Sequence, residues 1–310
     1  MSKHSAAARL VLVLLCEAGV YAVICAALAR VDDLPVLALL ALWVALYFCT
    51  RLVLVLATFA FAWWSQRPWN LTVRGWITMV SAEFMALLRV EWLILSEAWR
   101  GESSGVSERN DSLPLIIFLH GIYCNRGVWR PVMRKLQYAG CVMRALSLAP
   151  VTADLATQTR SLAAWLESNP GRNSRQRVIV VAHSLGGLIA RGCLPHASIN
   201  ALICIGTPHA GSRVANALHS AIGKDLQPHS SAIDALAARR NGTGPITCLY
   251  SPQDNLVVPA GSATLAGLPR ASVAATGHLA LIYSPVVLDA IRQAIAHAAV
   301  QRSAIVTEPA

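Results

Sequence analysis

The sequence predicts an α/β protein, a parallel sheet flanked by helices, preceded by transmembrane helices. In roughly the last two hundred residues, short apolar runs alternate with helical stretches, as in a parallel sheet covered on both faces. Two long apolar runs lie near the N-terminus. The chain is also unusually apolar, with 55% hydrophobic and only 14% charged residues, whereas about 25% charged residues is usual in soluble domains.

The two apolar runs predict a membrane hairpin within residues 1–70. They cover residues 10–28 and 34–64, and each contains one charge. A spanning helix needs about 20 apolar residues, so each run is long enough. A cleavable signal peptide is the alternative for the first run, although its apolar core exceeds the usual length of about 7–15 residues.

The charges inside the two runs are Glu17 and Arg51. Folding the hairpin at the short polar connection brings them within about one helical turn of each other. We expect an ion pair, because a carboxylate inside a membrane costs roughly 2.5–3.5 kcal/mol. A neutral Glu17 that faces the other helix is the alternative.

Basic residues flank the hairpin on both sides. Lys3 and Arg9 precede the first run, and Arg67, Arg74 and Arg89 follow the second. This bias favours the cytoplasmic side for both ends and for the C-terminal domain. The formal charge of +10 suits an anionic lipid surface. No nucleic-acid motif or basic run is present, so the expected partner is a membrane and not a nucleic acid.

Residues 71–112 connect the hairpin to the C-terminal domain. In residues 71–100, polar side chains follow one narrow helical stripe, and six of the nine tryptophans lie between positions 63 and 99. Tryptophan favours the membrane–water interface, so we expect an interfacial helix. A helix that packs on the C-terminal domain is the alternative. Residues 101–112 are a polar linker.

Residues 113–300 form the predicted α/β domain, followed by a tail at 301–310. Residues 211–244 are a long, mostly helical insertion, which we expect to lie over the C-terminal ends of the strands. Helices are expected at 153–169 and 285–300. Strands are expected at 113–121, 141–148, 177–184, 201–208, 246–252 and 271–277.

The stretch "VIVVAHSLGG" places Ser184 between an expected strand and an expected helix. A sharp strand-to-helix turn requires small residues two positions before and after it, and here these are Ala182 and Gly186. Such a turn exposes a serine hydroxyl at the sheet edge, as in the nucleophile elbow G-x-S-x-G. Ala182 departs from the first glycine of that pattern by one methyl group.

A serine nucleophile needs a base and an acid that orients the base. Both are expected after the serine in this architecture. Asp254 follows one expected strand and His278 follows the last, and only these two candidates satisfy both chain order and position at the sheet edge. His120 and His183 are interpreted as structural residues.

A tetrahedral intermediate also needs N–H donors for its oxyanion. Ile122 follows the "HG" that ends the first strand, and Leu185 follows the serine. We expect their backbone N–H groups to form the oxyanion hole.

The segments "LHG", "AHSLGG", "GTPHAGS", "PQDNLVVP" and "GHLALIYSP" occur in this order and resemble the α/β-hydrolase superfamily, specifically bacterial triacylglycerol lipases and esterases. The resemblance covers about residues 113–300. It implies an α/β-hydrolase fold without the first strands of larger members, with Ser184 as nucleophile, Asp254 as acid and His278 as base. It implies the same oxyanion donors, Ile122 and Leu185.

The resulting expectation is a membrane-anchored serine hydrolase, a lipase or esterase in a bacterial inner membrane, acting on lipid or other esters. An acyltransferase with the same triad and a non-catalytic membrane scaffold are the alternatives. No cofactor is expected. No metal is expected either, because the eight cysteines form no CxxC and no Cys/His cluster with metal spacing. The sequence makes no prediction of the oligomeric state.

Overall fold

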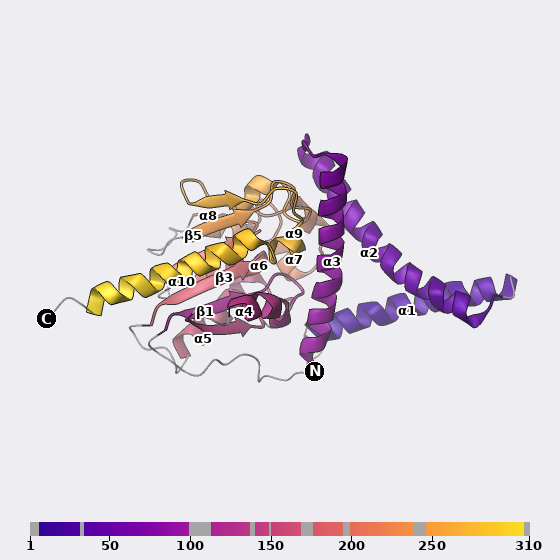
Figure 1. Cartoon of the computed structure of the whole chain (residues 1–310), viewed down its shortest axis with the longest axis horizontal. Coiled ribbons are helices and arrows are strands. Elements are labelled where there is room, and N and C mark those ends of the chain that lie inside the picture. Colours follow the sequence, from indigo (N-terminus) through magenta and orange to yellow (C-terminus); the bar gives the residue numbers. More distant parts are fainter. Residues whose placement is uncertain are drawn as a thin grey trace.

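The computed structural model describes residues 6–31, 34–98, 113–136, 140–148, 150–168, 176–194, 199–238 and 246–306. An α/β domain carries the C-terminal residues, and the N-terminal helices project from one side of it (Figure 1). The expected linker at 101–112 and the end of the expected tail lie outside the described residues.

The described part of the α/β domain contains a six-stranded sheet in the order β2-β1-β3-β4-β5-β6, and every neighbouring pair is parallel. The predicted fold class is thereby confirmed. The last strand, which forms an exposed edge of the sheet, is shorter than expected and ends at Ser272. The strands are β1 (Leu115–Leu119), β2 (Val142–Leu146), β3 (Val178–His183), β4 (Ala201–Ile205), β5 (Ile246–Tyr250) and β6 (Arg270–Ser272).

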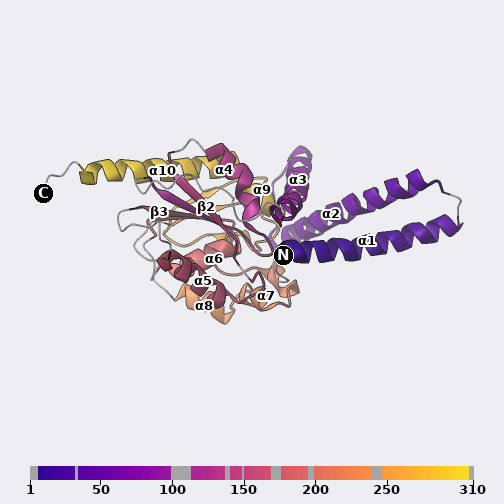
Figure 2. The same ribbon diagram turned by 90° about the horizontal axis from the view of Figure 1, so that it is seen from below.

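Successive side chains of a strand point to opposite faces of the sheet. Both faces here carry apolar side chains, and helices cover both. Leu115, Ile117 and Leu119 of β1 belong to one buried cluster with α5 (Leu155–Ser168) and α6 (Leu185–Cys193). Ile116 and Phe118 belong to a second cluster. The second cluster includes residues of α4 (Arg130–Leu136) and α10 (Pro285–Val306). The two layers are visible from below in Figure 2.

The insertion contains the 3-10 helix η2 (Arg213–Ala217) and the short helices α7 (Ala221–Asp225) and α8 (Ser231–Ala237). The cap of α7, Ser220, lies 2.8 Å from the hydroxyl of Tyr123, in the loop after β1. Arg191 of α6 donates to the carbonyl of Leu236 in α8 at 3.0 Å. Only the first part of the insertion therefore lies near the strand ends, whereas α8 extends the layer of α5 and α6.

The N-terminal helices α1 (Ala6–Val31) and α2 (Val36–Gln66) form an antiparallel hairpin. Cross-contacts join them, including one from Trp43 to the carbonyl of Ala18 at 3.4 Å. By length and composition, three segments of the described chain are apolar enough to cross a membrane: these two helices and residues 278–297. The third packs in the domain, with Val287 and Ile291 fully buried.

A polar network joins the hairpin to the next helix, α3 (Val73–Ala98). The expected ion pair forms, with Arg51 Nη1 2.5 Å from Glu17 Oε2. Arg51 Nε also lies 3.2 Å from Glu91 Oε1 of α3. Tyr47 donates its hydroxyl proton to Glu91 at 2.6 Å. One buried cation thus holds carboxylates from two other helices.

Helix α3 runs crosswise between the hairpin and the α/β domain (Figures 1 and 2). Met79, Ala86 and Val90 are buried on one side. Other apolar side chains of α3 are exposed at helical spacing: Val73 by 77%, Ile77 by 62%, Met85 by 60% and Trp92 by 62%. One face of α3 therefore packs inside the protein, as in the packing alternative, and another face presents apolar side chains outward; an interfacial location of that face stays a prediction.

Candidate active site

Ser184 occupies the turn between β3 and α6. Its backbone has φ 53° and ψ −123°, a region that costs a non-glycine residue about 1–3 kcal/mol. The Ser184 N–H donates to the carbonyl of Ile205 at 2.9 Å, and the Gly187 N–H donates to the Ser184 carbonyl at 3.0 Å. These bonds from both sides hold the strained turn in place.

Close packing explains the small residues around this serine. A Cβ atom on Gly186 would lie 2.8 Å from the carbonyl oxygens of both Leu119 and His120, so a side chain cannot be accommodated there without movement. Ala182 is fully buried in β3, where its methyl group fits. The turn therefore has the geometry of a nucleophile elbow.

Asp254, on the loop after β5, and His278, at the start of the short helix that follows β6, form a buried pair. His278 Nδ1 lies 2.8 Å from Asp254 Oδ2, and the side chains are 4% and 1% exposed. The other carboxylate oxygen accepts the N–H groups of Leu256 and Val257, each at 2.8 Å. Because an ionised carboxylate only accepts, this arrangement assigns the proton to Nδ1 and leaves Nε2 free to accept a proton.

The structure brings the three expected residues to the same edge of the sheet. A Cβ atom on Gly206, directly after β4, would lie 3.2 Å from His278 Nδ1 and 3.3 Å from Asp254 Oδ2. The ring centroids of His183 and His278 are 4.5 Å apart, and His183 immediately precedes Ser184. The imidazole and the carboxylate thus lie beside the glycine that follows β4, and the residue before that glycine, Ile205, accepts the N–H of Ser184.

The segments that carry the two expected oxyanion donors lie next to the serine turn. Leu185 is the first residue of α6, and the first N–H groups of a helix have no acceptor within it. Ile122 follows Gly121, where an added Cβ would lie 3.1 Å from Ser184 Cβ. The loop before Ile122 and the start of α6 are therefore adjacent.

His120 holds the loop that carries Ile122. Its Nδ1 lies 2.8 Å from the Gly121 carbonyl, and its Nε2 accepts the Leu148 N–H at 2.9 Å. Burial lowers the pKa of His120 to about 4, so the ring is neutral and donates from Nδ1. These contacts fit the loop-shaping role expected from the sequence.

Two other histidines near the sheet edge are also buried and neutral. Burial lowers the pKa of His183 well below its usual value, and His183 Nε2 lies 3.2 Å from the His278 carbonyl. Burial lowers the pKa of His209 to about 3. By contrast, burial lowers the pKa of His278 but the Asp254 and Glu83 carboxylates raise it more, so its net shift is upward.

Sequence reasoning missed two residues that hold the His278 segment. Glu83 of α3 accepts the backbone N–H groups of Leu279 and Ala280 at 3.0 and 2.8 Å. Asn255, next to Asp254, accepts the His278 N–H at 2.9 Å. A signal for Glu83 was present, because it is an isolated carboxylate among apolar residues of a predicted helix.

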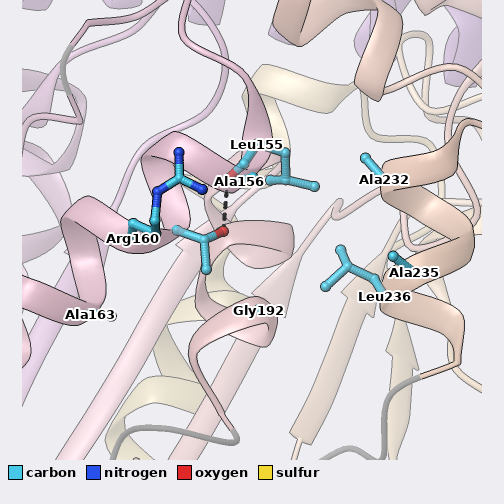
Figure 3. Close-up of a pocket in the computed structure, with 9 residues that line it drawn as sticks. Leu155, Ala156, Arg160, Ala163, Gly192, Ala232, Ala235 and Leu236 are labelled. Carbon is cyan, nitrogen blue, oxygen red and sulfur yellow. Dashed lines mark hydrogen bonds between the residues drawn. The ribbon is translucent and has the colours of Figure 1, made fainter.

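A separate apolar groove lies between α5, α6 and α8 (Figure 3). Its lining includes Leu155, Leu236 and Gly192, with Arg160 at its side. Gly192 is near the C-terminal end of α6, whereas Ser184 precedes its N-terminal end. This groove is therefore distinct from the site around the serine. In the described part of the chain, no group of three or more His, Cys, Asp or Glu side chains is arranged to hold a metal ion.

A parallel sheet, a serine on a strand-to-helix elbow, and a histidine–aspartate pair after later strands at the same edge together define an α/β hydrolase. The sequence agrees with this class. The chain belongs to the alpha/beta hydrolase family, whose model matches residues 116–307.

Two solved lipases share the fold at low sequence identity. Aspergillus fumigatus lipase B is 16% identical, with a TM-score of 0.53 over 63% of this chain and 55% of that one. This chain thus spans about half the length of that lipase. The mature form of Bacillus licheniformis lipase BlEst2 is 18% identical, with a TM-score of 0.53 over 62% of this chain and 96% of that one. Among curated proteins, none matches the sequence.

Proposed function

We propose that the protein is a membrane-anchored serine hydrolase that cleaves carboxylic esters of lipid-like substrates through an acyl-enzyme. The observation that carries this proposal is the buried pair of His278 and Asp254, 2.8 Å apart, beside the strained turn of Ser184. A neutral imidazole oriented by a carboxylate next to a serine on an elbow is the arrangement that activates a hydroxyl group.

In the first half of the reaction, His278 Nε2 removes the proton from Ser184 Oγ as Oγ attacks the ester carbonyl. The carbonyl oxygen becomes an oxyanion, which accepts hydrogen bonds from the N–H groups of Ile122 and Leu185. The intermediate then collapses, the bond to the alcohol oxygen breaks, and His278 returns its proton to the leaving alcohol. The acyl group remains on Ser184.

The second half repeats these steps with water. His278 removes a proton from water, which attacks the acyl carbonyl at the same oxyanion donors. The bond to Ser184 Oγ breaks, Oγ takes the proton back from His278, and the carboxylic acid leaves. Asp254 stabilises the imidazolium that forms in each half, and it stays ionised throughout.

The N-terminal helices support the membrane part of the proposal. Helices α1 and α2 are long and apolar enough to cross a bilayer. The outward face of α3 adds four exposed apolar side chains, including Trp92, and helix α3 itself lies across the base of the hairpin (Figure 1). We propose that this face rests in the interfacial layer, with the hydrolase domain on the cytoplasmic side. A membrane-dissolved ester is then the natural substrate.

A fluorophosphonate probe and p-nitrophenyl esters of graded chain length test the proposal on the full-length protein in lipid nanodiscs. Wild type should be labelled and should hydrolyse the esters, and Ser184→Ala should do neither. Ser272→Ala is the matched control, because Ser272 is an exposed serine on β6 and its loss should change neither readout. Equal labelling of Ser184→Ala and wild type would refute the assignment.

A further inference from the structure

Helix α3 reaches the segment that carries His278 through Glu83. This side chain is only 1% exposed, and each of its oxygens accepts one backbone N–H from the two residues that follow His278. Gly277 leaves room for the carboxylate, since an added Cβ there would lie 2.5 Å from Glu83 Oε2. Glu83 therefore holds the first turn of α9 (His278–Leu281) from outside the hydrolase domain.

A second connection runs from helix α2. Thr58 Oγ1 accepts a hydrogen bond from Asn255 Nδ2 at 2.9 Å. Asn255 Oδ1 in turn accepts the His278 N–H at 2.9 Å. The backbone of His278 and of the two residues after it is thus fixed by side chains that depend on both α2 and α3.

From these contacts we propose that Glu83 is a positioning residue for His278, so that helix α3 completes the active site as well as connecting it to the membrane hairpin. This inference rests on the proposed function. A carboxylate buried to this extent is costly unless it is hydrogen-bonded. Its two N–H bonds reduce that cost, although burial is the larger effect and raises the pKa of Glu83 overall.

The charges around His278 give Glu83 a second effect. The titratable groups that face the imidazole are Asp254, Glu83 and His183. Burial favours the neutral imidazole, whereas Asp254 and then Glu83 favour the protonated one and raise its pKa. Glu83 should therefore stabilise the imidazolium that forms in each half of the reaction, in addition to fixing the position of the ring.

The test compares full-length variants in lipid nanodiscs by the rate of fluorophosphonate labelling against pH, and by kcat and KM for a p-nitrophenyl ester. Glu83→Gln keeps the shape but removes the charge and turns an N–H donor toward a backbone donor. We expect a fall in kcat of about 10-fold to 100-fold from a misplaced base, with KM nearly unchanged. The pH midpoint of labelling should move downward.

Two further variants separate an effect on the position of His278 from an effect on the stability of the whole protein. Glu83→Asp keeps the charge and should recover part of kcat and the wild-type pH midpoint. Glu91→Gln is the matched control, because it also removes a carboxylate from α3, but Glu91 contacts Arg51 and Tyr47 instead of α9. It should keep the wild-type labelling rate and pH midpoint.

The inference is overturned if folded Glu83→Gln labels at the wild-type rate with the same pH midpoint. It is also overturned if Glu83→Gln and Glu91→Gln lose activity equally. If Glu83→Gln does not fold, Glu83→Asp decides, since reduced kcat at constant KM supports the inference and wild-type kcat rejects it. Failure of the proposed function is distinguishable, because wild type would then show no labelling that depends on Ser184.

Discussion

Asp254 contacts His278 with one carboxylate oxygen and its own loop with the other. Oδ2 lies 2.8 Å from the imidazole, while Oδ1 accepts the N–H groups of Leu256 and Val257. The side chain is thereby fixed before it orients the ring. An amide in its place retains the loop contacts only by turning its NH2 group toward His278 Nδ1.

Asp254→Asn should therefore fold normally and lose activity. The amide donates to Nδ1, which forces the proton onto Nε2, the nitrogen that has to accept the serine proton. We expect kcat to fall about ten-thousand-fold with a thermal midpoint close to that of wild type. Ester hydrolysis and circular dichroism melts measure the two quantities, and an active Asp254→Asn variant would remove Asp254 from the proposed triad.

Gly206 is buried and should be sensitive to substitution. Its φ of 53° disfavours a side chain by about 1–2 kcal/mol, and an added Cβ would press on His278 and Asp254 at 3.2 and 3.3 Å. Gly206→Ala should lower kcat at least 10-fold. Gly261→Ala is the control, since nothing lies within 4 Å of its added Cβ. Equal kcat in both variants would contradict this account.

The buried neutral histidines should make the hydrolase domain sensitive to acid. His120 has a folded pKa of about 4 against about 6.5 when unfolded. Its stabilising contribution is therefore complete above pH 6.5 and is lost as pH falls toward 4, by up to about 3 kcal/mol. Burial shifts His183 and His209 in the same direction. Melting temperatures measured from pH 7 to pH 4 test this.

The matched variant for this test is His120→Asn. It should be less stable than wild type at pH 7, because it loses contacts to Gly121 and Leu148. Its melting temperature should nevertheless fall less steeply with acid, since one proton-binding group is gone. If the melting temperature of His120→Asn falls with acid as steeply as that of wild type, groups other than His120 cause the acid sensitivity.

The network around Arg51 predicts an order of stabilities in nanodiscs. Arg51→Leu leaves Glu17 and Glu91 without their shared cation, and breaking a buried pair costs about 3–5 kcal/mol. Replacing both Glu17 and Arg51 still leaves Glu91 in place. Recovery of the lost stability should therefore require that Glu17, Arg51 and Glu91 are all replaced by apolar residues. A double variant as stable as the triple would show that Glu91 carries no unpaired charge.

Much of the fold could be predicted because its signals are local. Apolar runs mark the strands, and the small residues around Ser184 mark the elbow. Chain order then selects Asp254 and His278. The contacts of Glu83 and Thr58 join residues 196 and 197 positions apart, and no local pattern encodes such a distance. The packing of α8 beside α6 depends likewise on tertiary contacts, so the position of the insertion was only partly predicted.

The crosswise position of α3 has a kinetic consequence. Hydrogen bonds tie the segment after His278 to this helix, so in the proposed membrane-anchored enzyme the active site stays at a constant height above the bilayer. The enzyme then meets an ester in the same bilayer by lateral diffusion. The ester concentration that sets the rate is therefore its number per unit area of membrane. Turnover per molecule should follow the mole fraction of ester among inert lipids and should be insensitive to the volume of water around the vesicles.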